Sequence, residues 1–344
     1  MSENKLNYNI QYLRGICAIV VFFSHSLNIY KIGWVQSLMP THFHFFFDGQ
    51  WAVIFFFTLS GFYYYRETQF SVRGYIRGLV KKSLRIYSPH LLSLIIGWIM
   101  LTVYIKYGIY VDSNEMTAWA SKFWQDNVSL KELLCNAMVL APHNPDAINP
   151  PSWYLSPEVK MFILMPIVVA ISNRGKLIPS ILLFAISWFI LLPLISCIGP
   201  FVAGYLLHVF LCKKHSVKIG KSLTLTLILV GCLLLNSRNI AKQFSFDSTQ
   251  TYFMMIQSMG ALCLIFLANV WTFSRQSKVL LFLGNISYEF YILHFIVLMS
   301  LAPWIPNSYV FVVLSLVVTL FGAHWMNKFN KRLLLLSNCS KLIL

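Results

Sequence analysis

Residues 9–30 read NIQYLRGICAIVVFFSHSLNIY, an apolar stretch that carries Arg14 near its start and His25 near its end. As a helix it is long enough to cross about 30 Å of hydrocarbon. Apolar runs of similar length recur to the end of the chain, separated by short polar stretches. This stretch therefore predicts a membrane-spanning helix, and its recurrence predicts a chain that crosses the membrane many times.

The composition supports the same conclusion. Of the 344 residues, 58% are hydrophobic, and 11 Asp and Glu stand against 27 Lys and Arg. The mean hydropathy is +0.67. A soluble domain with this balance would lack the polar surface needed to cover its core. The net charge of +16 would suggest nucleic acid on a soluble surface, but the basic residues stand at the ends of apolar runs. The charge therefore indicates membrane topology, and we expect no nucleic-acid partner.

Apolar windows predict about ten transmembrane helices and an all-α, polytopic bundle. The predicted ranges are 9–30, 45–65, 87–107, 153–172, 177–195, 196–212, 222–236, 251–270, 283–302 and 308–326. The fifth and sixth ranges meet at the stretch Ser196 to Pro200, where the chain forms either a helical hairpin or one broken helix. The apolar stretch at 130–140 is too short to span and is predicted to lie at the interface or to re-enter.

The even number of helices places both termini on one side, and the distribution of Lys and Arg favours the cytoplasm for that side. The cytoplasmic cations would then be Arg66, Arg73, Arg77, Lys81, Lys82, Arg85, Arg174, Lys176, Lys213, Lys214, Lys218, Lys221, Arg275, Lys278, Lys328, Lys331 and Arg332. The large basic loop before residue 87 is cytoplasmic, and the long segment 108–152 is outside. No repeat or linker divides the chain, so residues 1–344 are predicted to form one membrane domain with no separate soluble domain.

Ionisable groups inside spans are costly and mark either a functional site or a buried pair. Arg14 and His25 lie about 16 Å apart along one helix and about 20° apart around it. Glu158 follows Trp153 on a helix that begins at the outer surface, which places its carboxylate at nearly the depth of His25. An imidazole beside a carboxylate can act as a general base. The alternatives are a histidine bonded only to backbone and a Glu158 that neutralises a cation such as Lys160.

Other polar residues give weaker signals. Arg85 ends the basic loop and is either a positive-inside anchor or a clamp on a phosphate. Glu289 and His294 lie five residues apart and so not on one helix face, and His294 is predicted to be a mid-span hydrogen bonder. The seven cysteines are scattered with no CxxC and no histidine at metal spacing, so neither a disulfide framework nor a metal site is expected.

Five blocks in order resemble the acyltransferase type three family, which includes O-acetyltransferases of bacterial surface polysaccharides. They are YLRGICAIVVFFSH at 12–25, GQWAVIFFFTLSGFYYYR at 49–66, KKSLRIYSPH at 81–90, PPSWYLSPEVKMFILMP at 150–166 and GNISYEFYILH at 284–294. Any one block alone would be weak, but five in the same order along nearly the whole chain are specific.

The resemblance implies a catalytic role for His25, with Glu158 as a site carboxylate. It implies that Arg14, Arg85 and Lys82 bind the acyl donor. The supporting residues that it implies are Ser60, Gly61, Trp153, Ser287, Tyr288 and His294. The donor would be an acyl-CoA, usually acetyl-CoA, used as a substrate with no permanently bound cofactor. Gln11 and Lys82 differ from the acidic residue and the arginine that are common in the family.

The function that follows is a multi-pass O-acetyltransferase of the cell inner (cytoplasmic) membrane, surrounded by membrane lipids. Its acceptor would be a hydroxyl of an O-antigen, an exopolysaccharide or a lipid-linked glycan at the outer side, as in lipopolysaccharide modification. The alternative is a multi-pass transporter or flippase of a glycan or acyl compound, with Arg14, His25, Glu158 and His294 lining its path. The sequence leaves the oligomeric state open, a homo-oligomer included.

Overall fold

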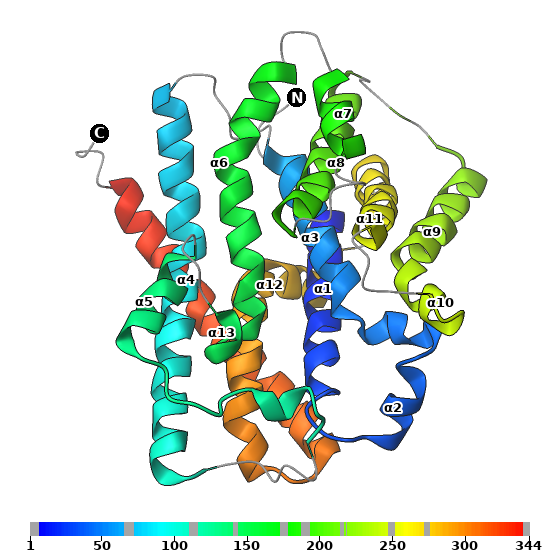
Figure 1. Ribbon diagram of the computed structural model, residues 1–344. Coiled ribbons are helices and arrows are strands. Elements are labelled where there is room, and N and C mark those ends of the chain that lie inside the picture. Colours follow the sequence, from blue (N-terminus) through cyan, green and yellow to red (C-terminus); the bar gives the residue numbers. More distant parts are fainter. Residues whose placement is uncertain are drawn as a thin grey trace. The chain divides into compact units, whose positions relative to one another are not determined.

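In the part of the chain that the computed structural model describes, the regular elements are all helices, and every element drawn in Figure 1 is a coiled ribbon. The described residues are 7–64, 72–109, 116–139, 144–172, 178–186, 193–213, 217, 219–246, 252–271 and 276–339. Extended pairing within these ranges is confined to one isolated bridge, between Tyr30 and Met116. The prediction of an all-α protein is confirmed.

Thirteen α-helices and five short 3-10 helices make up this part of the chain. The α-helices are α1 (Tyr8–Ser26), α2 (Gly33–Leu38), α3 (Gly49–Tyr64), α4 (Val72–Tyr107), α5 (Leu130–Met138), α6 (Leu155–Ser172), α7 (Ile178–Ile186), α8 (Pro193–Lys213), α9 (Lys221–Leu235), α10 (Ser237–Gln243), α11 (Tyr252–Val270), α12 (Lys278–Leu301) and α13 (Ser308–Cys339). The 3-10 helices are η1 (His42–Phe47), η2 (Ala120–Lys122), η3 (Pro145–Ala147), η4 (Pro150–Tyr154) and η5 (Ala302–Trp304).

Each of the ten predicted ranges overlaps one of these helices, but fewer of the described helices have the length and apolarity of a full span. Four segments do: Lys82–Tyr107, Tyr252–Val270, Lys278–Trp304 and Ser308–Leu334. A fifth span would result if α9 and α10, bent by 56° at their junction, cross the membrane together. The protein is therefore a helical membrane protein, whereas the count of ten spans and the cytoplasmic termini stay predictions.

Two predicted boundaries are wrong. The basic segment before residue 87 is predicted as a loop, but α4 already begins at Val72 and continues through Pro89. Its Lys, Arg and Leu residues favour helix, and Ile76, Val80 and Leu84 recur at helical spacing. The break predicted at 196–200 lies inside α8, which begins at Pro193, a residue suited to the first turn of a helix.

Several residues used in the sequence analysis lie outside the described part of the chain. They are residues 65, 177, 187–192 and 251 of the predicted helices, residues 110–115 and 140–143 of the predicted outer segment, and Arg66, Arg174, Lys176, Lys214, Lys218 and Arg275 of the cations that set the orientation.

The chain forms two compact units, each built from three stretches of sequence. Unit 1 comprises Met1–Val21, Ser37–Thr68 and Lys160–Asn285; unit 2 comprises Phe22–Gln36, Gln69–Val159 and Ile286–Leu344. Helices α1, α2, α6 and α12 contribute residues to both units. In unit 1, α3 packs against α8 and α11, and α11 packs against α9; in unit 2, α4 packs against α13 and α5. The single domain predicted for residues 1–344 stays a prediction.

Helices α3 and α8 approach so closely that their backbones touch at two glycines. A Cβ atom built on Gly61 would lie 1.9 Å from the carbonyl oxygen of Phe201. A Cβ atom on Gly204 would lie 1.9 Å from the carbonyl oxygen of Thr58. Small residues permit such contacts between membrane helices. Gly61, which the resemblance marks as a supporting residue, therefore has a packing role in unit 1.

Substituting Gly61 with alanine is expected to force α3 and α8 apart, at a cost of about 3 kcal/mol or more for overpacking against rigid backbone. The measurement is thermal unfolding of the purified protein, together with its yield from membranes. Gly33→Ala is the matched control, because nothing lies within 4 Å of the Cβ position there. An unchanged unfolding temperature for Gly61→Ala would contradict the close packing of α3 on α8.

Helix α5 confirms a helix in the stretch 130–140, and its location at the membrane interface stays a prediction. Ser129 and Glu132 form a reciprocal capping box at its start. Leu130, Leu134 and Met138 recur every four residues and are all exposed. An amphipathic helix of this length suits the plane of the interface better than a crossing.

The capping box makes the start of α5 pH-sensitive. The backbone N–H and hydroxyl of Ser129 donate to the Glu132 carboxylate at 2.9 and 2.8 Å. These hydrogen bonds lower the pKa of Glu132 below its ordinary value. The cap is therefore complete above the ordinary pKa and is lost as the pH falls through the lowered one. Hydrogen exchange at 130–138 should be faster in Glu132→Ala than in the wild type at neutral pH. The difference should vanish in acid; a difference that persists there would contradict this account.

Candidate active site

Two of the histidines that the sequence places inside spans, His25 and His294, lie together in unit 2. His25, near the end of α1, and His294, in α12, approach to 2.6 Å between His25 Nδ1 and His294 Nε2. Their ring centroids are 5.0 Å apart and their planes differ by 4°, so the contact is an in-plane hydrogen bond. His294 is fully buried, and His25 is half-buried. His294 forms hydrogen bonds, as predicted, and its side-chain partner is His25, whereas its mid-span depth stays a prediction.

The hydrogen bonds of this pair fix which ring nitrogens carry protons. His294 Nδ1 lies 2.6 Å from the backbone carbonyl oxygen of Tyr291. A carbonyl oxygen only accepts, so His294 Nδ1 must carry the hydrogen. When both rings are neutral, His294 Nε2 is then an acceptor and His25 Nδ1 must donate to it. The remaining nitrogen, His25 Nε2, is left unprotonated and able to accept a proton.

Aromatic rings surround the histidine pair. The indole of Trp119 stacks on the His25 imidazole, with centroids 5.5 Å apart and planes 14° from parallel. Phe295 meets His25 edge-on at 5.7 Å, and Phe22 meets His294 edge-on at 6.4 Å. Trp119 comes from the segment that follows α4, and the sequence reasoning missed it because that segment shows no helical or strand periodicity.

Glu158 lies in the first turn of α6 and is buried. Its Oε2 atom accepts a hydrogen bond from the Tyr154 hydroxyl at 2.9 Å. The Tyr154 ring packs against Tyr291 at 5.6 Å, and Tyr291 supplies the carbonyl that orients His294. Tyr154 and Tyr291 thus connect the Glu158 carboxylate to the carbonyl that orients His294. The side-chain hydrogen bond of His25 is made with His294, and the role of Glu158 as a site carboxylate stays a prediction.

A second group of polar contacts ties α12 to α4 and α13. The Tyr288 hydroxyl donates to the Ile86 carbonyl at 2.7 Å. Asn330 Nδ2 donates to the Arg85 carbonyl at 3.4 Å and to the buried Glu289 carboxylate at 3.3 Å. Arg85, Glu158 and Glu289 all act electrostatically on the Tyr288 hydroxyl. This arrangement brings Arg85 and Tyr288, two residues that the resemblance marks, into one neighbourhood.

The other site residues predicted from the sequence are more scattered. Ser287 is buried in α12, Lys82 is half-buried in α4, and Trp153 is exposed in η4, all in unit 2. In unit 1, Arg14 Nη1 donates to Gln11 Oε1 at 3.5 Å, and Ser60 is half-buried in α3 beside Gly61. Their roles in donor binding and support stay predictions.

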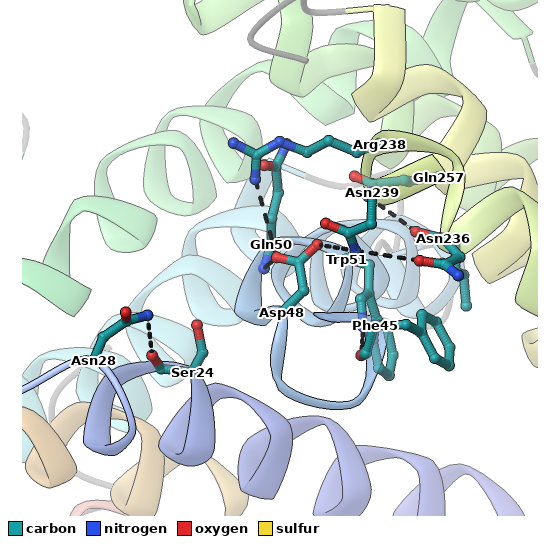
Figure 2. Close-up of polar contacts among 11 residues, drawn as sticks. Ser24, Asn28, Phe45, Asp48, Gln50, Trp51, Asn236, Arg238, Asn239 and Gln257 are labelled. Carbon is teal, nitrogen blue, oxygen red and sulfur yellow. Dashed lines mark hydrogen bonds and ion pairs between the residues drawn. The ribbon is translucent and has the colours of Figure 1, made fainter. Parts of the chain in front are cut away.

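Unit 1 contains a polar cluster that the sequence reasoning missed, centred on buried Asp48 (Figure 2). The Asp48 carboxylate accepts from Asn239 Nδ2 at 2.9 Å and from the Gln50 backbone N–H at 3.0 Å. Arg238 lies 4.0 Å from the same carboxylate. Nearby, the Trp51 indole donates to the Phe45 carbonyl at 2.9 Å. These contacts cap the start of α3 and tie it to α10, so the cluster has a structural role.

The fold and the histidine pair define a helical membrane protein with a buried, oriented imidazole. A comparison with protein families shows which kind of membrane protein this is: a model described as an acyltransferase domain matches residues 7–327. The chain belongs to the acyltransferase type three family, as the five sequence blocks indicate, and it is a membrane acyltransferase. Comparisons with curated proteins and with solved structures returned no match.

Proposed function

We propose that this acyltransferase transfers an acetyl group from cytoplasmic acetyl-CoA to a hydroxyl of a surface polysaccharide, with His25 as the general base. The acceptor would be reached at the outer side of the cytoplasmic membrane, in an O-antigen, an exopolysaccharide or a lipid-linked glycan. The observation that supports the proposal most strongly is the hydrogen-bond chain from Tyr291 through His294 to His25, because it leaves His25 Nε2 as a free base.

In the proposed reaction, His25 Nε2 takes the proton from the acceptor hydroxyl as its oxygen attacks the thioester carbonyl carbon. The new C–O ester bond forms, the C–S bond breaks, and CoA leaves as a thiolate that receives the proton from His25. His294 stabilises the imidazolium in between, because its Nε2 atom accepts from His25 Nδ1 in the plane of both rings. His25 thus acts as the base and His294 as the group that orients it.

Donor binding is proposed for Arg14, Lys82 and Arg85. In the predicted orientation, all three lie toward the cytoplasmic ends of their helices, where CoA is found. Guanidinium groups bind phosphate with paired hydrogen bonds, and Lys binds it as a point charge. Arg85 is exposed in α4 and lies close enough to Tyr288 to act on it electrostatically. Both observations support a role for the Arg85 guanidinium in donor binding.

Inside-out membrane vesicles from cells that make their own surface glycan provide a direct test, because their cytoplasmic face meets the medium. Acetyl-CoA labelled in the acetyl group is added, and label in the glycan fraction is counted. We expect glycan-bound label only when the chain is present. Equal labelling with and without the chain would overturn the proposal, and chain-dependent movement of glycan without labelling would favour a transporter.

A further inference from the structure

We propose that Trp119 is a positioning residue that covers the His25–His294 pair and keeps water from competing with the acceptor hydroxyl. The inference rests on the proposed function, since it concerns which nucleophile the base activates. It assigns a role to the segment 116–124, for which the sequence offers no motif.

The stacking of Trp119 on His25 covers the imidazole without obstructing proton transfer in the ring plane. Trp119 lies against the face of the His25 ring, 14° from parallel. The lone pair of His25 Nε2 lies in the ring plane, as does the hydrogen bond to His294. The indole therefore shields the face of the imidazole and leaves the direction of proton transfer open.

The rings of Phe123 and Phe295 pack beside Trp119, on the same side of His25. Trp119 meets Phe123 edge-on at 5.0 Å and Phe295 edge-on at 6.0 Å. Phe123 and Phe295 also pack on one another at 5.2 Å. Phe123 and Phe295 are buried and Trp119 is half-buried. The surroundings of the base on this side are apolar, and a water molecule there would find few hydrogen-bond partners.

Trp119 is held in place by contacts between its segment and residues 28–30, which follow α1. The Thr117 N–H donates to the Ile29 carbonyl at 3.1 Å, and the Thr117 hydroxyl donates to the Asn28 carbonyl at 2.5 Å. Tyr30 and Met116 form the isolated bridge. The segment thus attaches just beyond His25, on the side that the predicted orientation places toward the acceptor.

The following residues anchor the segment again. The Trp124 indole N–H donates to the Ile148 carbonyl at 2.9 Å, and this contact is buried. Trp124 adopts a positive φ of 58°, which non-glycine residues take only when their surroundings fix it. Trp119 therefore lies between two fixed points.

The chemical need for a cover follows from the base itself. A base that can deprotonate a sugar hydroxyl can also deprotonate water. The competing reaction converts acetyl-CoA and water into acetate and CoA. Enzymes suppress such side reactions by excluding water from the site. The ratio of free acetate to glycan-bound acetyl therefore reports the function of the cover more directly than total activity does.

The experiment compares Trp119→Ala with wild type in the labelled inside-out vesicles, at matched amounts of folded protein. We expect the ratio of labelled acetate to glycan-bound label to rise about ten-fold in Trp119→Ala, as water enters the site. Trp119→Phe keeps a ring face and should stay near the wild-type ratio. Trp325→Ala, which removes an exposed tryptophan of α13, should leave the ratio unchanged.

If Trp119→Ala fails to accumulate, Trp119→Leu takes its place, because leucine fills volume without a flat face; its ratio should exceed that of Trp119→Phe. An unchanged ratio, with both products lowered equally, would overturn the inference and leave Trp119 with a structural role only. Absence of labelled glycan from the wild type would instead overturn the proposed function, so the two failures are distinguishable.

Discussion

His25→Ala should lower acetyl transfer by about 10³-fold or more, because removal of a positioned general base costs typically 10²–10⁴-fold. In the pair, the basic nitrogen that remains available is His25 Nε2. His294 uses Nδ1 for the Tyr291 carbonyl and Nε2 for His25. The measurement is the initial rate of glycan labelling in inside-out vesicles, at matched protein levels.

His42→Ala is the matched control for this experiment. His42 is an exposed histidine of η1 in unit 1, where it contacts Gln243 at 3.1 Å. Its removal should leave the rate near the wild-type value. Retention of half the wild-type rate by His25→Ala, with a normal yield of folded protein, would exclude His25 as the base.

His294→Phe should lower the rate by about 10²-fold, because the orienting partner is lost while the aromatic volume is kept. Without an acceptor at His294 Nε2, the His25 ring is free to place its hydrogen on either nitrogen and to rotate. The loss should fall on kcat and spare the KM for acetyl-CoA, since His294 contacts the base and is assigned no role in donor binding.

His294→Gln provides the internal comparison, because the glutamine amide oxygen can accept from His25 Nδ1. We expect His294→Gln to retain clearly more activity than His294→Phe. Equal losses in the two variants would indicate that His294 contributes packing alone. A raised KM with an unchanged kcat would place His294 at the donor instead of beside the base.

The helices could be predicted from apolar length because lipid demands it, and each of the ten predicted ranges overlaps a helix. The two wrong boundaries, at α4 and α8, also arise from predicting helices by apolar length. Residues 72–86 are too basic to register as apolar, yet their Lys, Arg and Leu residues favour helix, and the segment extends α4. The stretch Ser196 to Pro200 suggested a break, but α8 continues through Pro200, as membrane helices tolerate an interior proline.

The candidate site could be predicted only in part. Helical geometry placed His25 inside a span as one candidate base among other interpretations, but its hydrogen-bond partner His294 lies 269 residues away in sequence, and depth alone favoured Glu158. Membrane depth fixes one coordinate of a side chain and leaves its direction around the helix and its neighbours open. Trp119 lies in a segment held by contacts to residues 28–30, which follow α1, and such contacts leave no periodic signal in a single sequence.

Mass spectrometry of the surface polysaccharide tests the central claim most directly. The samples are cells without the chain, cells with the wild-type chain and cells with His25→Ala at matched expression. We predict an acetyl mass increment on the polysaccharide with the wild-type chain that is absent from the other two. An identical polysaccharide in cells with and without the chain would contradict the account, as would full acetylation in cells carrying His25→Ala.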